Sequence, residues 1–187
     1  MAMLMIFLQC RSAVFSLCLA LAASEVHAND AMITWPAGWE VESLPTDTGL
    51  AAQPSVQIRQ RAVKNDQLGN PIMVMELTQT RLMPGHEVNV HGVLLEMRKS
   101  IQVNFARGGL QSACTPVRDG VLGDVPALET TCTITQNGVH ALTQTLVAAA
   151  SKDRAWSLSY AGSAQGYADN KEQALEIRNS LKLEAAP

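Results

Sequence analysis

The spacing of hydrophobic and polar residues divides most of the chain into predicted strands and helices. Apolar residues alternate with polar ones in several segments, as they do in strands that bury one face. The predicted strands cover residues 39–44, 55–63, 72–82, 110–117, 127–135, 140–150 and 154–162. Apolar residues recur at helical spacing over about 88–107 and about 167–181, which predicts two amphipathic helices. This order of strands, helix, strands and helix predicts an α+β fold, in which an antiparallel sheet packs against the helices.

A different hydrophobic pattern marks the start of the chain. Arg11 precedes an apolar run over residues 13–22, and small residues lie at the positions that a signal peptidase reads before Ala28. We expect a secretory signal over residues 1–28, a single domain over residues 29–187 and a periplasmic location. A retained membrane anchor is the alternative, but the apolar run is shorter than the roughly 20 residues that a spanning helix needs. We expect no membrane insertion after cleavage.

Removal of this signal would leave two of the four cysteines, Cys114 and Cys132. An even number of cysteines in an exported protein predicts a disulfide. Their midpoint is Gly123, within a turn rich in Gly and Asp, so a hairpin that reverses there would place the two side chains opposite each other. Closing this loop should stabilise the fold by about 3 kcal/mol. A redox or metal-binding pair is the alternative, but the chain has no Cys-x-x-Cys spacing and no histidine beside either thiol.

The composition argues against several classes of partner. The formal net charge is −3 and charged residues make up 17% of the chain, a balance too mild to indicate nucleic-acid binding. Aromatic residues make up 4% of the chain, so we expect no platform on which sugars or bases could stack. We expect a monomer without a cofactor.

A soft-metal site is one chemistry that the sequence could supply. His86 and His91, together with Met73, Met75 and Met83, could bind an ion such as Cu(I). We favour a structural role for the methionines, because Met73 and Met75 share one face of a predicted strand and methionine often fills core space.

Hydrolysis is the other chemistry that we considered. The segment Ala-Gly-Ser-Ala-Gln-Gly over residues 161–166 comes closest to a nucleophile motif, at Ser163. We predict instead that Ser163 caps the last helix. Glu87 and Glu96 flank the central helix, and neither has a second acid with which to share a proton. We therefore expect no catalytic residue, and a small hydrolase is the third candidate function.

Two further groups of residues could mark a binding surface. Trp35 and Trp39, beside Pro36, could anchor a partner, but we favour a place in the core at the edge of the sheet. Four threonines lie on neighbouring predicted strands, and this indicates either a solvated sheet face or one lightly covered by a partner. We favour the solvated face for these residues, which are Thr131, Thr133, Thr143 and Thr145.

Several features of the chain resemble known families. Pro36, Gly38 and Trp39 form a Pro-x-Gly-Trp start, and the last strand, Trp-Ser-Leu-Ser-Tyr-Ala-Gly, leads into a helix that ends Ile-Arg-Asn-Ser-Leu-Lys-Leu. With a central helix and a meander between them, this order resembles the PsbP-like α-β-α sandwich, which photosystem extrinsic subunits share with a Ran-interacting import factor. The chain is more closely similar to short exported proteins of unknown function from pseudomonad-type bacteria, through residues 92–109 and 126–138.

The resemblance implies a non-catalytic role, because PsbP-like domains mostly bind other proteins or assist their assembly. It carries over no catalytic residues, and a fold does not fix a function. We therefore expect an exported accessory or binding module that acts on a protein partner or on a component of the cell envelope. The alternative is a periplasmic protein that binds a small ligand or a soft metal.

Overall fold

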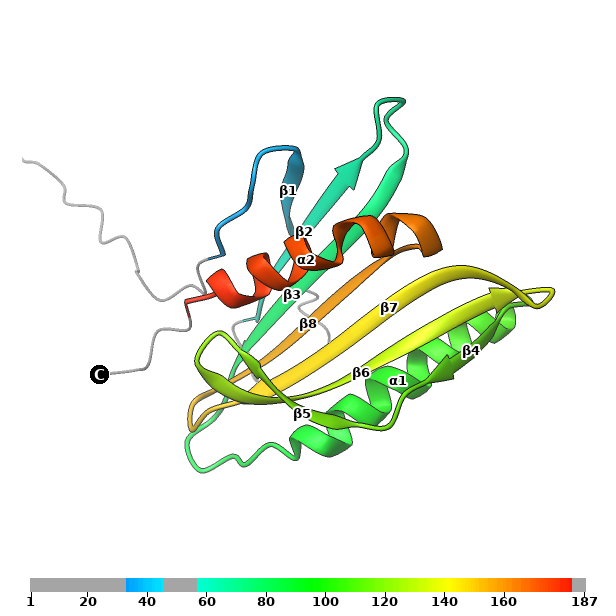
Figure 1. The fold of residues 1–187 in the computed structure, drawn as a ribbon. Helices are drawn as coiled ribbons and strands as arrows, with labels where there is room; N and C mark the ends of the chain where they lie inside the picture. Colours follow the sequence, from blue (N-terminus) through cyan, green and yellow to red (C-terminus); the bar gives the residue numbers. More distant parts are fainter. Residues whose placement is uncertain (1–32, 46–56, 183–187) are drawn as a thin grey trace, which may run out of the picture.

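The computed structural model describes residues 33–45 and 57–182, which form one sheet with a helix on each face (Figure 1). The elements are β1 (Trp39–Leu44), β2 (Gln57–Asn65), β3 (Pro71–Arg81), α1 (Val90–Arg107), β4 (Gln111–Cys114), β5 (Arg118–Leu122), β6 (Val125–Gln136), β7 (Val139–Ala150), β8 (Arg154–Ser163) and α2 (Ala164–Ser180). The strand order is β1-β2-β3-β8-β7-β6-β4, and β5 pairs with β6 as well. The predicted signal over residues 1–28 lies outside the described residues.

The predicted α+β class, antiparallel sheet and two helices are confirmed. The single strand predicted over residues 110–117 is wrong in its extent, because this segment contains β4 and then leaves the sheet before β5 begins. Pro116 lies in the gap, and proline lacks the N–H group that a sheet ladder needs. α2 begins at Ala164 rather than at about 167, because Ser163 caps it and accepts a hydrogen bond from a main-chain N–H in the first turn at 3.0 Å.

The hairpin predicted around Gly123 is confirmed. Gly123 has a φ of 61°, which glycine adopts without steric cost, and Leu122 pairs with Val125 across the turn. Cys114 lies directly opposite Cys132 in the pairing of β4 with β6. A disulfide joins the two residues, whose Cα atoms are 3.9 Å apart. The predicted disulfide is therefore present and links β4 to β6.

The larger hydrophobic core lies between the sheet and α2. This helix packs on β3, β7 and β8, and the alternation along these strands directs every second side chain towards it. The buried core residues are Trp39, Ala62, Met73, Met75, Leu77, Leu122, Ala127, Val147, Ala149, Trp156, Leu158, Tyr160, Tyr167, Ala174, Ile177 and Leu181.

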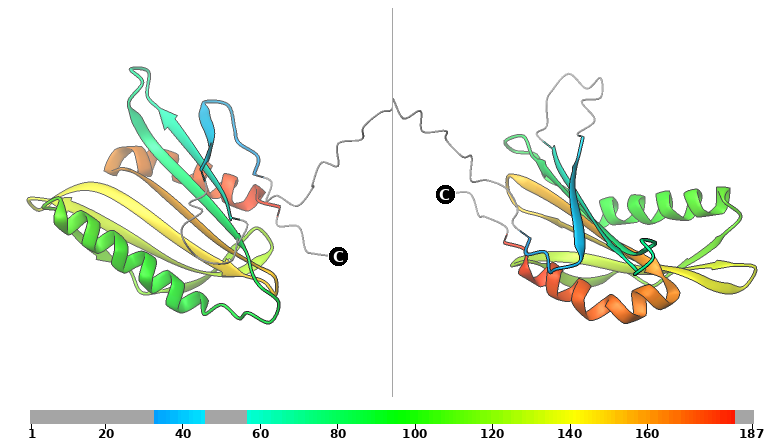
Figure 2. Two further views of the ribbon diagram at one scale, coloured as in Figure 1. Left: turned by 180° about the vertical axis from the view of Figure 1, so that it is seen from behind. Right: turned by 90° about the horizontal axis from the view of Figure 1, so that it is seen from above.

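A smaller core lies on the opposite face, under α1. This helix packs on β4, β6 and β7, and its one buried residue, Leu94, contacts a cluster that contains Leu146 and Ala148. Figure 2 shows that α1 lies over one part of this face of the sheet and leaves β3 and the strands beyond it without a covering helix on the same face. Neither described helix has the length and apolar character that crossing a membrane requires. On the α1 face, the polar side of the uncovered strands lies beside α1.

Candidate functional site

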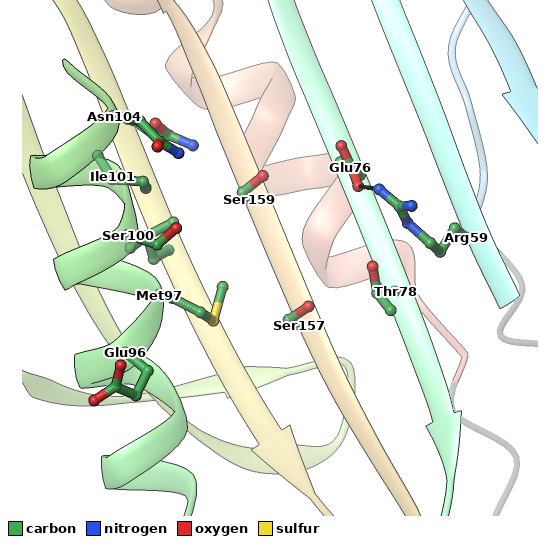
Figure 3. A pocket seen from close by; sticks show the side chains of 12 residues that line it. Arg59, Glu76, Thr78, Glu96, Met97, Ser100, Ile101, Asn104, Ser157 and Ser159 are labelled. Carbon is green, nitrogen blue, oxygen red and sulfur yellow. Dashed lines mark hydrogen bonds and ion pairs between the residues drawn. The ribbon is translucent and has the colours of Figure 1, made fainter. Parts of the chain in front are cut away.

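A cleft of about 610 Å³ lies beside α1, over the part of the sheet that the helix leaves uncovered (Figure 3). Strands β2, β3, β7 and β8 supply its floor, and one flank of α1 supplies its wall. We call this surface the α1 cleft. Its lining residues are Arg59, Glu76, Thr78, Glu96, Met97, Ser100, Ile101, Asn104, Gln144, Leu146, Ser157 and Ser159.

The floor of the α1 cleft is polar because of the residue alternation along β8. The large apolar residues of β8, which are Trp156, Leu158 and Tyr160, face α2. Ser157 and Ser159 alternate with them along the strand, so these two serines face the cleft and are half-buried. In the sheet register Ser157 lies opposite Thr78 of β3, and Ser159 lies between Glu76 of β3 and Leu146 of β7. Cross-strand neighbours share a face, so these side chains form one continuous floor.

The wall of the cleft is formed by residues three or four positions apart on α1. Met97, Ser100, Ile101 and Asn104 have this spacing, which places them on one side of the helix. Met97 and Ile101 also pack against the smaller core, so the base of the wall is apolar. Ser100 and Asn104 are exposed and form its polar upper part. Figure 3 shows these four side chains on the side of α1 that faces β8.

Ion pairs line the far side of the cleft. Arg59 of β2 contacts Glu76 of β3 at 2.6 Å, and both side chains are about one-third exposed. Next to them, Arg61 lies opposite Glu76 in the register and contacts Glu42 of β1 at 3.7 Å. Exposed pairs of this kind contribute only about 0–1 kcal/mol each to stability. Their main consequence is that acidic and basic groups alternate across this edge of the cleft.

The side chains of the cleft are suited to hydrogen bonding. Hydroxyl and amide groups can donate and accept hydrogen bonds, and the cleft gathers them from three strands and a helix. No histidine is among the described residues that line it, so its serines lack the neighbouring base that most serine nucleophiles use. His140 lies away from these serines, because its side chain contacts Thr143 on the opposite face of the sheet at 2.9 Å.

The structure does not bring together the residues that were considered for a soft-metal site. Met73 and Met75 are fully buried in the core beneath α2. His86 and His91 are exposed, beside and on α1, at the other face of the sheet. Within the described ranges there is also no group of three or more His, Cys, Asp or Glu side chains placed to hold a metal ion.

The predicted structural roles of Ser163 and Trp39 are confirmed. Ser163 is the N-cap of α2, as its hydrogen bond with the first turn shows. Trp39 is 8% exposed in the larger core, and its Nε1 donates a hydrogen bond to Gln173 of α2 at 3.0 Å. Trp35 packs against the same core, with its ring centroid 5.9 Å from that of Trp39. The two tryptophans therefore fix the N-terminal segment to α2.

The solvated face favoured for the four threonines is wrong for two of them. Thr145 is 1% exposed and Thr143 is buried, because the first turn of α2 covers this part of the sheet. A hydrogen-bonded chain runs from Thr131 to Thr145 at 2.8 Å and on to the Tyr167 hydroxyl at 2.6 Å. Burial raises the pKa of Tyr167 to about 12, against the opposing effect of the hydrogen bond between Tyr167 and Thr145. Of the four threonines, Thr133 is exposed and Thr131 is half-buried.

Comparison with known proteins places the chain in a sequence family. A family described as a domain of unknown function (DUF4946) matches residues 30–183. The chain belongs to this family. A comparison with curated proteins gives no match.

Among solved structures, the cyanobacterial PsbP protein (CyanoP) from Synechocystis sp. PCC 6803 is similar to this member of the DUF4946 family. The TM-score is 0.56 at 8% sequence identity, and the alignment covers 81% of this chain and 85% of that chain. The expected PsbP-like fold is confirmed by this similarity. At so low an identity the likeness bears on the fold alone.

The α1 cleft is the feature of this DUF4946 protein that the sequence reasoning missed. A signal for it was present in the segment Trp-Ser-Leu-Ser-Tyr, where Ser157 and Ser159 lie on a central strand. Small polar residues at such positions indicate that no apolar layer covers that face. The sequence did not show where α1 would lie across the sheet, so the cleft beside it was not predicted.

Proposed function

We propose that the protein is an exported, non-catalytic binding module that receives a protein partner or a component of the cell envelope in the α1 cleft. The observation that carries this proposal is the hydrogen-bonding floor of the cleft, which lies on the uncovered side of a central strand. The other side of the same strand is packed against α2. A concave surface with several convergent polar groups is the usual form of a binding site.

The proposed location rests on two features of the chain. The apolar run and small residues before Ala28 have the pattern of a cleaved export signal. The disulfide between Cys114 and Cys132 fits an oxidising compartment such as the periplasm, where such bonds persist. The PsbP-like fold adds support by analogy only, because one fold can serve many functions.

A small polar ligand is the second candidate occupant. The volume of about 610 Å³ favours it, since sites for small molecules measure about 300–1,000 Å³. The cleft is open along the flank of α1, however, and an open groove is better suited to a segment of a larger molecule. We therefore rank the protein or envelope partner first.

Native mass spectrometry of the protein isolated from its own host tests the proposal. Ser100→Trp introduces a large side chain on the wall of the cleft, and Lys99→Trp introduces the same side chain on the preceding residue, which does not line the cleft. We expect the original protein and Lys99→Trp to retain a bound macromolecule that Ser100→Trp loses. The denatured mass should show cleavage after Ala28 and the loss of two hydrogens from the cysteines.

Two results would count against the proposal. Equal retention by both variants would place the partner elsewhere on the molecule. An added mass of a metal or a small molecule, with no macromolecule bound, would favour the second candidate.

A further inference from the structure

We infer that the α1 cleft binds an extended peptide segment that is uncharged or basic and carries a large apolar side chain at one end. This inference rests on the proposed function and specifies the chemistry of the partner. It is drawn from a second hollow, which continues the cleft along α1, and from the charges along both.

The second hollow has a volume of about 550 Å³ and lies beside the first turns of α1. It shares Glu96 and Met97 with the α1 cleft, so the two form one groove along the helix. Val88, Val93 and Met97 give it apolar walls, and Val93 is 41% exposed. We call it the apolar hollow. A large apolar side chain bound there would remove this surface from water, which is the main source of affinity in such pockets.

The polar part of the groove matches a peptide main chain. Ser100 and Asn104 on the wall and Gln144, Ser157 and Ser159 on the floor offer both donors and acceptors. Successive peptide units present N–H and C=O groups that need such partners. A hydrocarbon chain would leave the half-buried groups of the floor, Gln144, Ser157 and Ser159, without hydrogen bonds, at a cost in free energy. No Trp, Tyr or Phe is among the described residues that line the groove, and these are the side chains on which sugars usually stack.

The length of the groove sets the length of the bound segment. Val93 lies in the apolar hollow and Asn104 at the far end of the cleft wall. A helix rises about 1.5 Å per residue, so these two positions are about 16 Å apart along the axis of α1. An extended chain advances about 3.3 Å per residue, so about five residues of a partner would span this distance.

The charges along the groove favour a segment without acidic residues. Glu76, Glu87 and Glu96 line it, and Arg59, which is paired with Glu76, is the one lysine or arginine among the lining residues. Lys99, outside the lining, contacts Glu96 at 4.0 Å, but both side chains are more than 70% exposed, so water screens this pair. The lining therefore holds three carboxylates and one guanidinium group. This excess of carboxylates attracts basic groups and repels acidic ones.

Selection of binding peptides from a random phage-displayed library tests the inference. The target is the disulfide-bonded protein, and affinities are then measured with synthetic copies of the selected peptides. We expect the peptides to carry a large apolar residue next to a polar or basic stretch of about five residues, as the groove length requires. Val93→Asp should weaken their binding about tenfold or more, because it makes the apolar hollow charged.

Val103→Asp is the matched control. Val103 lies on the same helix and is also 41% exposed, but it lines neither the cleft nor the apolar hollow. Its substitution should leave the affinity unchanged. Selected peptides that are acidic, or that bind Val93→Asp and Val103→Asp equally well, would overturn the inference, and so would a library from which no peptide is enriched.

Ser100→Trp separates this inference from the proposed function. If Ser100→Trp abolishes peptide binding and Val93→Asp does not, the cleft binds a segment that does not reach the apolar hollow. The proposed function then stands and the inference fails. If peptides bind but neither variant weakens them, both fail, because the peptides then bind outside the groove.

Discussion

Replacement of Arg178 by methionine tests whether a buried ion pair holds α2 against the hairpin of β5 and β6. The side chains of Arg178 and Glu129 are 6% and 9% exposed, and they form an ion pair. Arg178 Nε also donates a hydrogen bond to the main-chain oxygen of Val121 at 2.8 Å. One guanidinium group therefore joins the helix to both strands of the hairpin.

The expected loss of stability follows from the burial of this pair. Removal of one partner costs about 3–5 kcal/mol, because the other charge stays buried without its counter-ion. Arg118 contacts Glu129 at 2.6 Å, but its side chain is 68% exposed, so it compensates only in part. We expect Arg178→Met to lower the free energy of unfolding by about 3 kcal/mol. The midpoint of thermal unfolding should then fall by roughly 6–12 °C for a domain of this size.

Urea unfolding of the disulfide-bonded protein, followed by circular dichroism, measures this loss. The matched variant combines Glu129→Met with Arg178→Met, which removes both buried charges together. Apolar replacement of a whole buried pair is often neutral or stabilising, so the double variant should be more stable than Arg178→Met alone. A loss below about 1 kcal/mol for Arg178→Met, which is typical of an exposed pair, would show that the buried ion pair does not hold α2 in place. The reasoning is also refuted by a double variant that loses as much as the two single variants together.

Three further perturbations have defined outcomes. Reduction of the bond between Cys114 and Cys132 should lower the free energy of unfolding by about 3 kcal/mol, and unfolding in urea with and without reductant measures this change. The raised pKa of Tyr167, about 12, means that its stabilising effect is complete below its ordinary value of 10.0 and is lost as the pH rises through about 12. A spectrophotometric titration should show a phenol that ionises near pH 12, and this step should be absent from the titration of Tyr167→Phe. Hydrogen bonds, chiefly from the main-chain N–H of Asn70, lower the pKa of Asp66, so its stabilising effect is present above its ordinary value of 3.8 and is lost as the pH falls through the lowered value. An NMR titration should detect this lowered pKa, and an Asp66 carboxyl that titrates at its ordinary value would contradict the hydrogen-bonded turn.

Local pattern was enough to predict most of the fold. The strand predicted over residues 72–82 matches β3 to within one residue at each end, because a strand that buries alternate residues shows its period directly in the sequence. The disulfide could be predicted because Cys114 and Cys132 are symmetric about the turn at Gly123, and the turn fixes the register of the hairpin.

Features that depend on how distant elements pack could not be predicted in this way. The place of α1 across the sheet is set by the packing of Leu94 against Leu146 and Ala148, and the cleft exists because that packing leaves β3 and β8 uncovered on the α1 face of the sheet. The ion pair of Glu129 with Arg178 joins residues 49 positions apart in the sequence, and the sequence around either residue does not indicate its partner. The candidate site therefore depends on tertiary packing, whereas the strands and helices that form it can be predicted from the spacing of hydrophobic residues.

A photo-crosslinking scan in the host cell tests most directly whether the α1 cleft is the binding surface. Benzoylphenylalanine would replace one residue at a time: Ser100 in the cleft, Lys99 beside it, Val41 on β1 and Lys171 on α2, all of them exposed. Our account predicts a strong adduct with a protein or an envelope component from position 100 and little from the other three positions. Adducts from position 41 or 171, with none from position 100, would contradict it.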